Sequence, residues 1–165
     1  MIKIAVIGKN ICDSRFIKER LVDYDVKNSI DLKISCFEKC ETLDAEYSDF
    51  NRFDMIILYV GYSGYDSSLS GIELAGRIRN FYGDEKAELV FVSDEAGDAC
   101  DAIRFRPFDF ILTPVTPGAV LNTLDRCVKK KCGSFHRFSF IKDRTENIIM
   151  VSRIRYLQSM GKRLI

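Results

Sequence analysis

The stretch Phe53–Ala75, FDMIILYVGYSGYDSSLSGIELA, decides the fold that we predict. It contains Met55–Val60, a continuous apolar run of the kind found in parallel strands that are buried on both faces. A loop rich in Gly, Ser and Tyr follows, and from Ser70–Gly71 onward the apolar residues recur at helical spacing. A buried strand, a loop at its carboxyl end and an amphipathic helix form one unit of an open α/β sheet, in which sites lie at that edge.

The remainder of the chain repeats this alternation of strand and helix. Strands are predicted at residues 2–7, 32–37, 55–60, 89–93 and 108–112, and helices at 14–26, 42–51, 71–79, 99–105 and 118–131. Asp13 is expected to cap the first helix, and Arg79 to lie on the exposed side of the third. The alternation predicts an α/β, doubly wound, five-stranded parallel sheet in the flavodoxin-like order 2-1-3-4-5, with a short β-rich C-terminal extension.

Length and composition favour a single domain with a small appendage. With 165 residues, 47% of them hydrophobic, the chain is long enough to bury a core. No apolar run approaches the roughly 20 residues that cross a bilayer, and the start, MIKIAVIG, lacks the layout of a signal peptide. The sequence therefore predicts a cytoplasmic protein with no membrane partner.

The cysteines and the histidine give no support to a metal site or to an enzyme. No two cysteines form a Cys-x-x-Cys pair, which favours reduced side chains packed as small apolar groups; they are Cys12, Cys36, Cys40, Cys100, Cys127 and Cys132. The lone histidine, His136, has no metal-ligand partner nearby and leaves little acid–base chemistry. Gly-rich phosphate motifs are absent, so Gly8 alone is thin support for a flavodoxin-like small-molecule binder. We predict no metal site, no cofactor and no enzymatic activity.

The net charge of +1 hides an asymmetry along the chain. Residues 1–128 carry 15 basic and 22 acidic side chains, whereas residues 129–165 carry 10 and 2. An acidic body joined to a basic end is typical of a regulatory domain followed by a segment that meets nucleic acid. A basic end that is merely solvated, or that pairs with the acidic body, is equally consistent with these counts.

Several segments resemble a known family. Asp54–Leu58 and Gly71–Ala75 resemble the centre of a two-component receiver domain, in which a short apolar strand leads to a phospho-accepting aspartate and a Gly-Ile/Leu-Glu-Leu helix follows the loop. Pro107–Pro114 is similar to the segment that ends such domains. The resemblance covers Met1 to about Lys130 and implies a receiver-like domain over residues 1–130.

The residues that carry the family's chemistry are mostly replaced. By the resemblance, the acidic pair that helps to bind Mg²⁺ falls on Gly8 and Lys9, the acceptor aspartate on Tyr59, the hydroxyl residue on Ser93 and the lysine on Thr113. Only Ser93 keeps the family's residue type. A phenol with a pKa near about 10 is a poor phosphoryl acceptor, and no carboxylate is left at these positions to coordinate Mg²⁺. We predict a degenerate receiver pocket that is not phosphorylated and needs no Mg²⁺.

Two further expectations follow from the receiver resemblance. Phe110 matches the family's switching aromatic residue and Ser93 its hydroxyl partner. Without a phosphoryl group to attract Ser93, we expect this pair to stay in one state, with Phe110 as a core residue. The peptide bond Thr113–Pro114 is expected to be cis, as in receivers.

Two features at the same edge of the sheet leave alternatives open. Lys9 either forms an ion pair with Asp94, which follows the fourth strand, or points to solvent. The loop Gly61–Ser70, with Tyr62 and Tyr65, is either a lid or partner contact, or a mobile Gly/Ser insertion.

The tail resembles a second family. After a linker at 131–136, Phe138–Lys142 and Ile148–Val151 are predicted as two short strands. Ser152–Arg163 then resembles the opening of a LytTR-type DNA-binding domain. This resemblance implies an incomplete LytTR-like β segment at 137–165, with candidate DNA contacts at Arg153, Arg155, Lys162 and Arg163.

Together the two resemblances imply an atypical response regulator. Its binding to DNA, through a complete C-terminal domain, would be controlled by dimerisation or by a regulatory protein partner instead of phosphorylation. The family's dimer surface would place Arg104, Arg106 and Asp109 in crossed ion pairs of a homodimer. The alternative is a protein-interaction module without DNA binding, and a salt-dependent affinity for DNA would separate the two because phosphate contacts release counterions.

Overall fold

The structure is a computed structural model. It describes the chain in six ranges, which are residues 1–61, 68–132, 137–142, 145–150, 159–160 and 163–164. The chain divides into two compact units, Met1–Cys127 and Val128–Ile165. Among the described residues, no helix combines the length and the apolar character that crossing a membrane requires.

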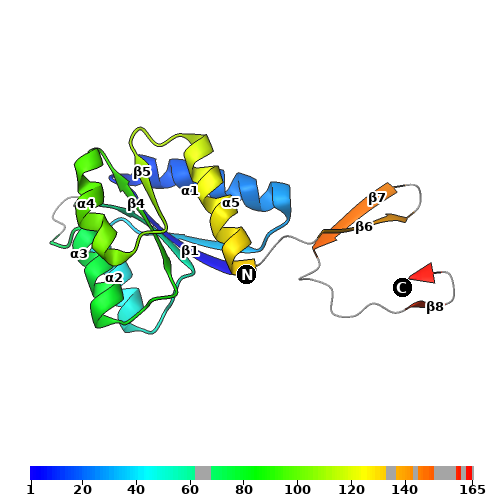
Figure 1. Ribbon diagram of the computed structural model, residues 1–165, viewed down its shortest axis with the longest axis horizontal. Helices are drawn as coiled ribbons and strands as arrows, with labels where there is room; N and C mark the ends of the chain where they lie inside the picture. Colours follow the sequence, from blue (N-terminus) through cyan, green and yellow to red (C-terminus); the bar gives the residue numbers. More distant parts are fainter. Residues whose placement is uncertain (62–67, 133–136, 143–144, 151–158, 161–162, 165) are drawn as a thin grey trace. The chain divides into compact units, whose positions relative to one another are not determined.

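Strands and helices alternate in the predicted order (Figure 1). The strands are β1 (Ile2–Ile7), β2 (Leu32–Cys36), β3 (Met55–Tyr59), β4 (Glu88–Ser93) and β5 (Asp109–Leu112). The helices are α1 (Ile11–Asn28), α2 (Cys40–Ser48), α3 (Gly71–Gly76), α4 (Ala99–Ala102) and α5 (Pro117–Cys132). A π-helical turn, η1 (Arg77–Phe81), continues α3, and the 3-10 turns η2 (Ala96–Asp98) and η3 (Ile103–Phe105) flank α4.

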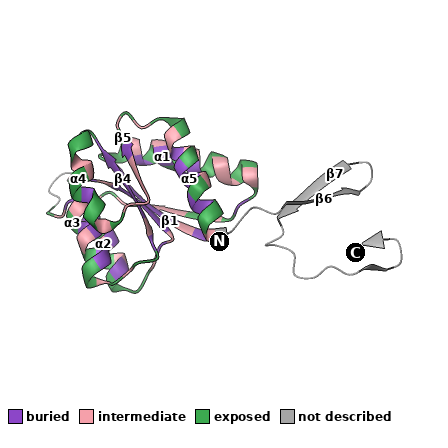
Figure 2. Ribbon diagram, in the orientation of Figure 1, coloured by how far each residue is buried: buried purple, intermediate pink, exposed green. Residues whose placement is uncertain are grey.

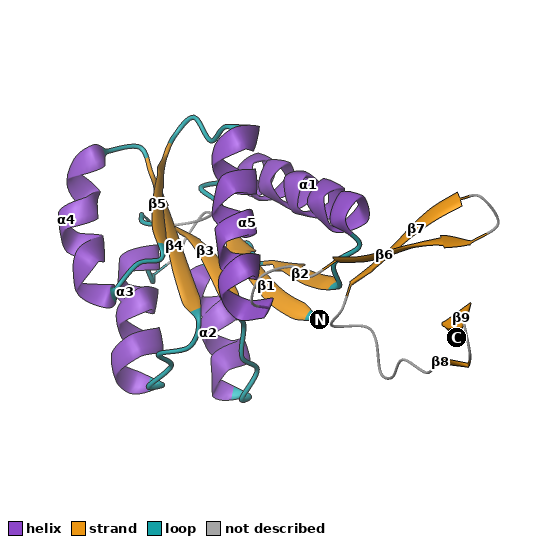
Figure 3. Ribbon diagram, turned by 45° about the vertical axis from the view of Figure 1, so that its right-hand side comes forward, coloured by secondary structure: helices purple, strands orange, loops and turns teal. Residues whose placement is uncertain are grey.

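The five strands form one parallel sheet in the order β2-β1-β3-β4-β5, which confirms the predicted flavodoxin-like fold. Helices α1 and α5 cover one face of this sheet, and α2, α3 and α4 cover the other (Figure 3). The central strand β3 is buried on both faces from Met55 to Leu58. Figure 2 shows that exposed residues are found mainly on the helices and loops. The more polar β2 lies at an edge, as its sequence predicts. The carboxyl end of β3 therefore opens at the middle of the sheet.

The first helix begins earlier than predicted. Asn10 is its N-cap instead of Asp13, because the Asn10 side-chain oxygen accepts a hydrogen bond from the Asp13 backbone N–H at 3.0 Å. Asn and Asp are equally good caps, and a carboxylate in the first turn interacts favourably with the helix dipole. The earlier start leaves only Gly8 and Lys9 between the end of β1 and the cap.

Helix α3 begins where the sequence predicts, after Ser70. The Ser70 hydroxyl accepts from the Glu73 N–H, and the Glu73 carboxylate accepts from the Ser70 N–H at 2.8 Å, which together form a capping box. Only glycine fits at the next position, because a Cβ atom on Gly71 would lie 1.8 Å from the carbonyl oxygen of Tyr59. This close approach fixes the start of α3 against the end of β3.

The prediction that Arg79 is exposed is wrong. Its exposed fraction is 7%, and its guanidinium donates to the backbone carbonyls of Asp84, Ala87 and Phe105. A π-helical turn contains more residues than an α-helical turn. The 3.6-residue period used for the prediction therefore does not hold across η1.

The prediction that the cysteines serve as packing residues holds in part. Cys40 and Cys127 are buried, but Cys12, Cys36 and Cys100 are exposed.

The second unit contains two antiparallel strand pairs. β6 (Arg137–Lys142) pairs with β7 (Thr145–Met150), which confirms that two strands lie here, although β7 begins three residues before the predicted Ile148. β8 (Ser159–Met160) pairs with β9 (Arg163–Leu164). Because α5 extends to Cys132, the predicted linker 131–136 begins inside that helix. Its remaining residues, 133–136, lie outside the described part of the chain.

Candidate functional site

Four side chains meet at the carboxyl edge of the sheet, and they come from the ends of four strands. Lys9 follows β1, Tyr59 ends β3, Asp94 follows β4 and Thr113 follows β5. The Asp94 Oδ2 atom accepts hydrogen bonds from the Lys9 ammonium and the Tyr59 hydroxyl, both at 2.7 Å. The Asp94 Oδ1 atom accepts from the Thr113 hydroxyl at 2.7 Å. These four residues are named the Asp94 cluster, and in it the ion pair between Lys9 and Asp94 is formed.

The cluster keeps the Asp94 carboxyl ionised. Hydrogen bonds from Lys9, Thr113 and Tyr59 lower its pKa to about 2. The same interaction with Asp94 raises the pKa of the Lys9 ammonium. Burial, and then the hydrogen bond to Asp94, raise the pKa of the Tyr59 hydroxyl. At neutral pH, Tyr59 is therefore a protonated donor and not a nucleophilic phenolate.

Backbone packing accounts for the glycine at the position of the family's first acidic residue. The Gly8 N–H donates to the Ser14 hydroxyl at 2.8 Å. A Cβ atom on Gly8 would lie 2.7 Å from the backbone nitrogen of Ser14, so no side chain fits there without a shift of α1. The start of α1 thus packs where a carboxylate would project, and Lys9 is the residue of this loop that reaches the cluster.

Ser93 is buried beside the cluster and bonds to its own loop instead. Its hydroxyl donates to the Asp98 carboxylate and accepts from the Glu95 N–H at 3.0 Å. Phe110 is only partly buried and packs against the margin of the hydrophobic core, so the expectation that it is a core residue holds in part. The Thr113–Pro114 bond is cis, which confirms that prediction.

An open depression of about 610 Å³ lies next to the cluster. It is lined by the start of α1 and by the loops after β1, β4 and β5, through Lys9, Cys12, Asp13, Phe16, Asp94, Thr113, Pro114 and Val115. Aromatic and aliphatic groups alternate there with one ammonium and two carboxylates. The depression therefore carries charges of both signs, and its charge does not select an anion over a cation.

The residues at this edge do not fit Mg²⁺, the ion that the receiver resemblance implies. Hard cations bind to several oxygen ligands, mostly carboxylates. Both oxygens of Asp94 already accept from protein donors, and one of these donors is the cationic Lys9. Within residues 1–61 and 68–131, no three His, Cys, Asp or Glu side chains gather as a metal site requires.

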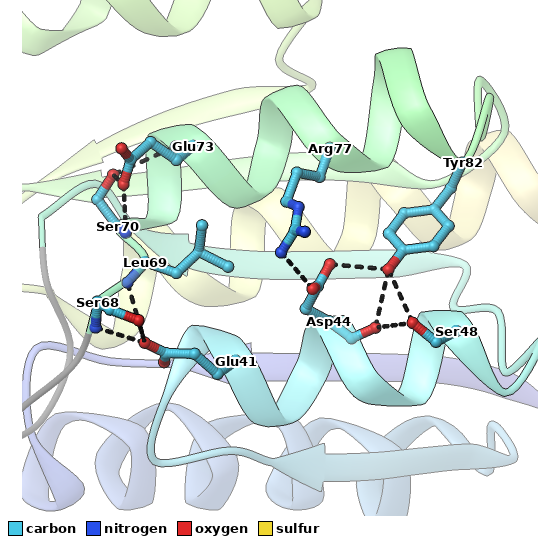
Figure 4. A network of polar contacts seen from close by, with 9 residues as sticks. All are labelled: Glu41, Asp44, Ser48, Ser68, Leu69, Ser70, Glu73, Arg77 and Tyr82. Carbon is cyan, nitrogen blue, oxygen red and sulfur yellow. Dashed lines mark hydrogen bonds and ion pairs between the residues drawn. The ribbon is translucent and has the colours of Figure 1, made fainter.

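A carboxylate on α2 holds the described end of the loop 61–70 (Figure 4). Glu41 accepts from the N–H and the hydroxyl of Ser68 and from the Leu69 N–H, the last at 2.9 Å. Tyr62 and Tyr65, the aromatic residues that suggested a lid or a partner contact, lie outside the described residues.

The three residues predicted for a dimer surface are engaged within the chain. Each forms an ion pair: Arg104 with Asp101, Arg106 with Glu85 and Asp109 with Arg126. Crossed pairs in a homodimer would replace these contacts, so they would add little stability. The homodimer stays a prediction.

The predicted DNA contacts fall almost entirely outside the described residues. Arg153, Arg155 and Lys162 lie outside them, and for Arg163 only the backbone, which begins β9, is described. Binding to DNA therefore stays a prediction.

Comparisons with known proteins agree on the fold. The response regulatory domain of protein mrkE from Klebsiella pneumoniae matches with a TM-score of 0.65 and 20% identity, over 78% of this chain and 97% of that chain. Chemotaxis response regulator CheY4 of Vibrio cholerae gives 0.62 and 17%, over 77% and 98%. The BeF3-activated DrrB receiver domain gives 0.62 and 18%, over 78% and 98%. No family model and no curated protein matches the sequence.

These likenesses show a receiver-like domain of the response-regulator fold. At 17 to 20% identity they show the fold and not the chemistry of the pocket.

Sequence reasoning located three members of the cluster but missed the central role of Asp94. Lys9, Tyr59 and Thr113 were found as replacements, and only Lys9 was considered as a partner of Asp94. A signal was present in the strand order: four neighbouring strand ends each supply a polar residue, and only one of these is a carboxylate.

Proposed function

We propose that this protein is an atypical response regulator whose receiver-like domain works without phosphorylation. The observation that carries the proposal is the Asp94 cluster. At the edge where a receiver would accept a phosphoryl group, an ionised carboxylate is already held by one ammonium and two hydroxyl groups. The carboxyl ends of four strands are linked through this one side chain.

The chemistry of the cluster opposes phosphoryl transfer. Transfer needs a reactive acceptor, a cation bound to the phosphoryl oxygens and room for those oxygens. Tyr59 donates its proton to Asp94 and has a raised pKa, so it is a weaker nucleophile at neutral pH than a solvated tyrosine. Lys9 is paired with Asp94, and Ser93 is bonded to Asp98.

Amide NMR of the full chain, with and without Mg²⁺ and beryllofluoride as a phosphoryl mimic, tests the proposal. We expect the signals of Lys9, Tyr59 and Ser93 to stay in place. The DrrB receiver domain, which has been activated with BeF3, is the positive control. Saturable shifts at these three residues would show that the pocket accepts a phosphoryl group and would overturn the proposal.

The proposed output is control of DNA binding by dimerisation or by a partner protein. The resemblance of Ser152–Arg163 to a LytTR opening and the basic excess of residues 129–165 support it. Affinity for duplex DNA, measured across a range of salt concentrations, should fall steeply as salt rises, because each phosphate contact releases counterions. Arg153→Ala should reduce the slope of log affinity against log salt by about 1 if that residue contacts a phosphate.

A second candidate is a protein-interaction module without DNA binding. The excess of 22 acidic over 15 basic side chains in residues 1–128 favours it, because such a body repels nucleic acid. No measurable affinity for DNA at low salt would favour this candidate over the first.

A further inference from the structure

Two phenylalanines lie exposed at the carboxyl ends of α2 and η1, where no core packing explains them. Phe50, two residues beyond α2, is 85% exposed, and Phe81, the last residue of η1, is 76% exposed. The Phe81 ring packs edge-to-face on Tyr82 at 5.0 Å between centroids. The Arg52 guanidinium lies 5.6 Å from the Tyr82 centroid and 6.0 Å from that of Phe50. Phe50, Arg52, Phe81 and Tyr82 thus form one continuous patch, named the aromatic surface.

The base of the aromatic surface is rigid. Figure 4 shows the Tyr82 ring reaching from the end of η1 to α2, where its hydroxyl donates to the Asp44 carboxylate at 2.9 Å and lies 3.0 Å from the Ser48 hydroxyl. Asp44 also accepts from Arg77. Beneath Arg52, at 4.7 Å, is the buried ring of Tyr47. The surface is held in place before any partner arrives, which lowers the entropy lost on binding.

Neither the backbone nor the core favours the exposed rings. Phe50 has a φ of +60°, in the left-handed region that is costly for a bulky side chain and is often found at functional sites. Phe81 ends a π-helical turn, another feature that is frequent at functional sites. Inside that turn, Arg79 is directed to buried carbonyls, while Phe81 remains in solvent. The stability of the folded chain therefore does not account for the aromatic residues.

The charge around the aromatic surface is negative. Residues 44–54 carry four carboxylates and one basic side chain, and residues 81–88 carry three and one. Two of these carboxylates, Asp44 and Glu85, are paired with Arg77 and Arg106. The carboxyl end of α2 adds the negative pole of a helix dipole. Aromatic faces attract ammonium and guanidinium groups, and Arg52 already shows this contact within the chain.

We infer that the aromatic surface docks a basic amphipathic segment of a partner protein, with lysine or arginine side chains flanking apolar ones. Apolar groups of the segment would cover Phe50 and Phe81, and its cations would meet the carboxylates around them. A second copy of this chain suits the surface less well, because a symmetric contact would bring two acidic rims together. This inference stands apart from the proposed function of the Asp94 cluster, which lies at the opposite, carboxyl edge of the sheet.

The test uses the full chain, labelled with ¹⁵N, and two synthetic amphipathic peptides as probes. Both share one pattern of Leu and Phe, and their polar positions are Lys/Arg in one peptide and Glu in the other. The basic peptide should shift the amides of Phe50, Arg52, Phe81 and Tyr82, and the acidic peptide should not. The double variant Phe50→Ser/Phe81→Ser should weaken binding at least tenfold.

A matched control separates this effect from a general loss of apolar surface. Val26 is also 76% exposed and belongs to α1, a helix that covers the other face of the sheet, so Val26→Ser should change the affinity less than twofold. Because all three side chains are exposed, the variants should keep the fold, which circular dichroism checks. Equal binding by the double variant, shifts confined to other residues, or no binding at millimolar basic peptide would each overturn the inference. A dimer that dissociates on the double substitution, seen by sedimentation velocity, would assign the surface to a second copy and overturn it too.

Discussion

Replacing Asp94 by asparagine is the most direct test of the Asp94 cluster, because it removes the charge and nearly keeps the shape. Lys9 and Tyr59 donate to one carboxylate oxygen and Thr113 donates to the other. An amide offers only one oxygen, so in either orientation at least one of these donors faces an NH₂ group. With the amide oxygen toward Lys9 and Tyr59, the NH₂ group can donate to the Thr113 hydroxyl, so the main loss is the charge that pairs with Lys9.

The structure allows the size of the effect to be worked out. A carboxyl pKa lowered from 3.8 to about 2 corresponds to at most about 2.4 kcal/mol, at 1.36 kcal/mol per pKa unit. The Asp94 side chain is 39% exposed, and solvent-screened ion pairs contribute about 1 kcal/mol or less. We expect Asp94→Asn to lower the free energy of unfolding by about 1 kcal/mol at neutral pH.

The contribution of Asp94 to the free energy of unfolding depends on pH. Because the folded-state pKa is depressed, the contribution of Asp94 to stability is fully present above the unfolded-state pKa near 3.8 and is lost as the pH falls through about 2. The stability difference between the wild type and Asp94→Asn should be constant from neutral pH to about pH 5 and then shrink in more acid solution. Urea unfolding followed by circular dichroism measures it.

The neighbouring substitution Glu95→Gln removes one exposed carboxylate whose side chain takes no part in the cluster, so it controls for net charge. It should change the free energy of unfolding by no more than about 0.5 kcal/mol. A difference for Asp94→Asn that equals that of Glu95→Gln, or that stays constant down to about pH 3, would refute the account of the cluster.

Three further substitutions, one of them with a matched control, probe the same domain. Lys9→Ala removes the strongest contact that depresses the pKa of Asp94, so this pKa should rise toward 3.8; ¹³C NMR of the Asp94 carboxyl follows it, and an unchanged titration would contradict the ion pair. Gly71→Ala would place a Cβ atom 1.8 Å from a backbone oxygen and should lower the free energy of unfolding by about 2 kcal/mol or more. Gly118→Ala, in open space on α5, is the control and should be neutral or stabilising by up to about 1 kcal/mol. Thermal unfolding compares the two variants. Arg79→Ala removes the donors to the backbone carbonyls of Ala87 and Phe105 and should lower the free energy of unfolding in urea by about 3 kcal/mol. A loss below about 1 kcal/mol would refute this role.

The fold follows from sequence because its main signals are local and periodic. The run at Met55–Val60 identifies the central strand, and the regular return of strand and helix fixes a parallel sheet. Helix starts and side-chain directions are harder to predict, because several residues can give the same local signal. Asn10 and Asp13 are equally good caps, and the backbone chooses the first. The inward direction of Arg79 depends on a π-helical turn that leaves no mark in the hydrophobic pattern.

The sequence predicts which residues lie at the candidate site, but it does not predict most of the hydrogen bonds between them. The receiver resemblance points to Lys9, Tyr59 and Thr113, and the strand order brings their strand ends together. Their convergence on one carboxylate depends on the length and direction of the side chains. The Tyr59 ring, for example, has to place its hydroxyl within 2.7 Å of the Asp94 carboxylate. Such distances are set by the packed loops and cannot be read from spacing along the chain.

The four residues of the Asp94 cluster do not tolerate substitution equally. Loss of any one donor leaves two contacts on the carboxylate, so the edge of the sheet tolerates change at Lys9, Tyr59 or Thr113. Loss of the acceptor removes all three of these hydrogen bonds in one step. An engineer who wishes to make this edge responsive to a new signal thus needs to control one residue, whereas redesign through the donors would require three coordinated changes.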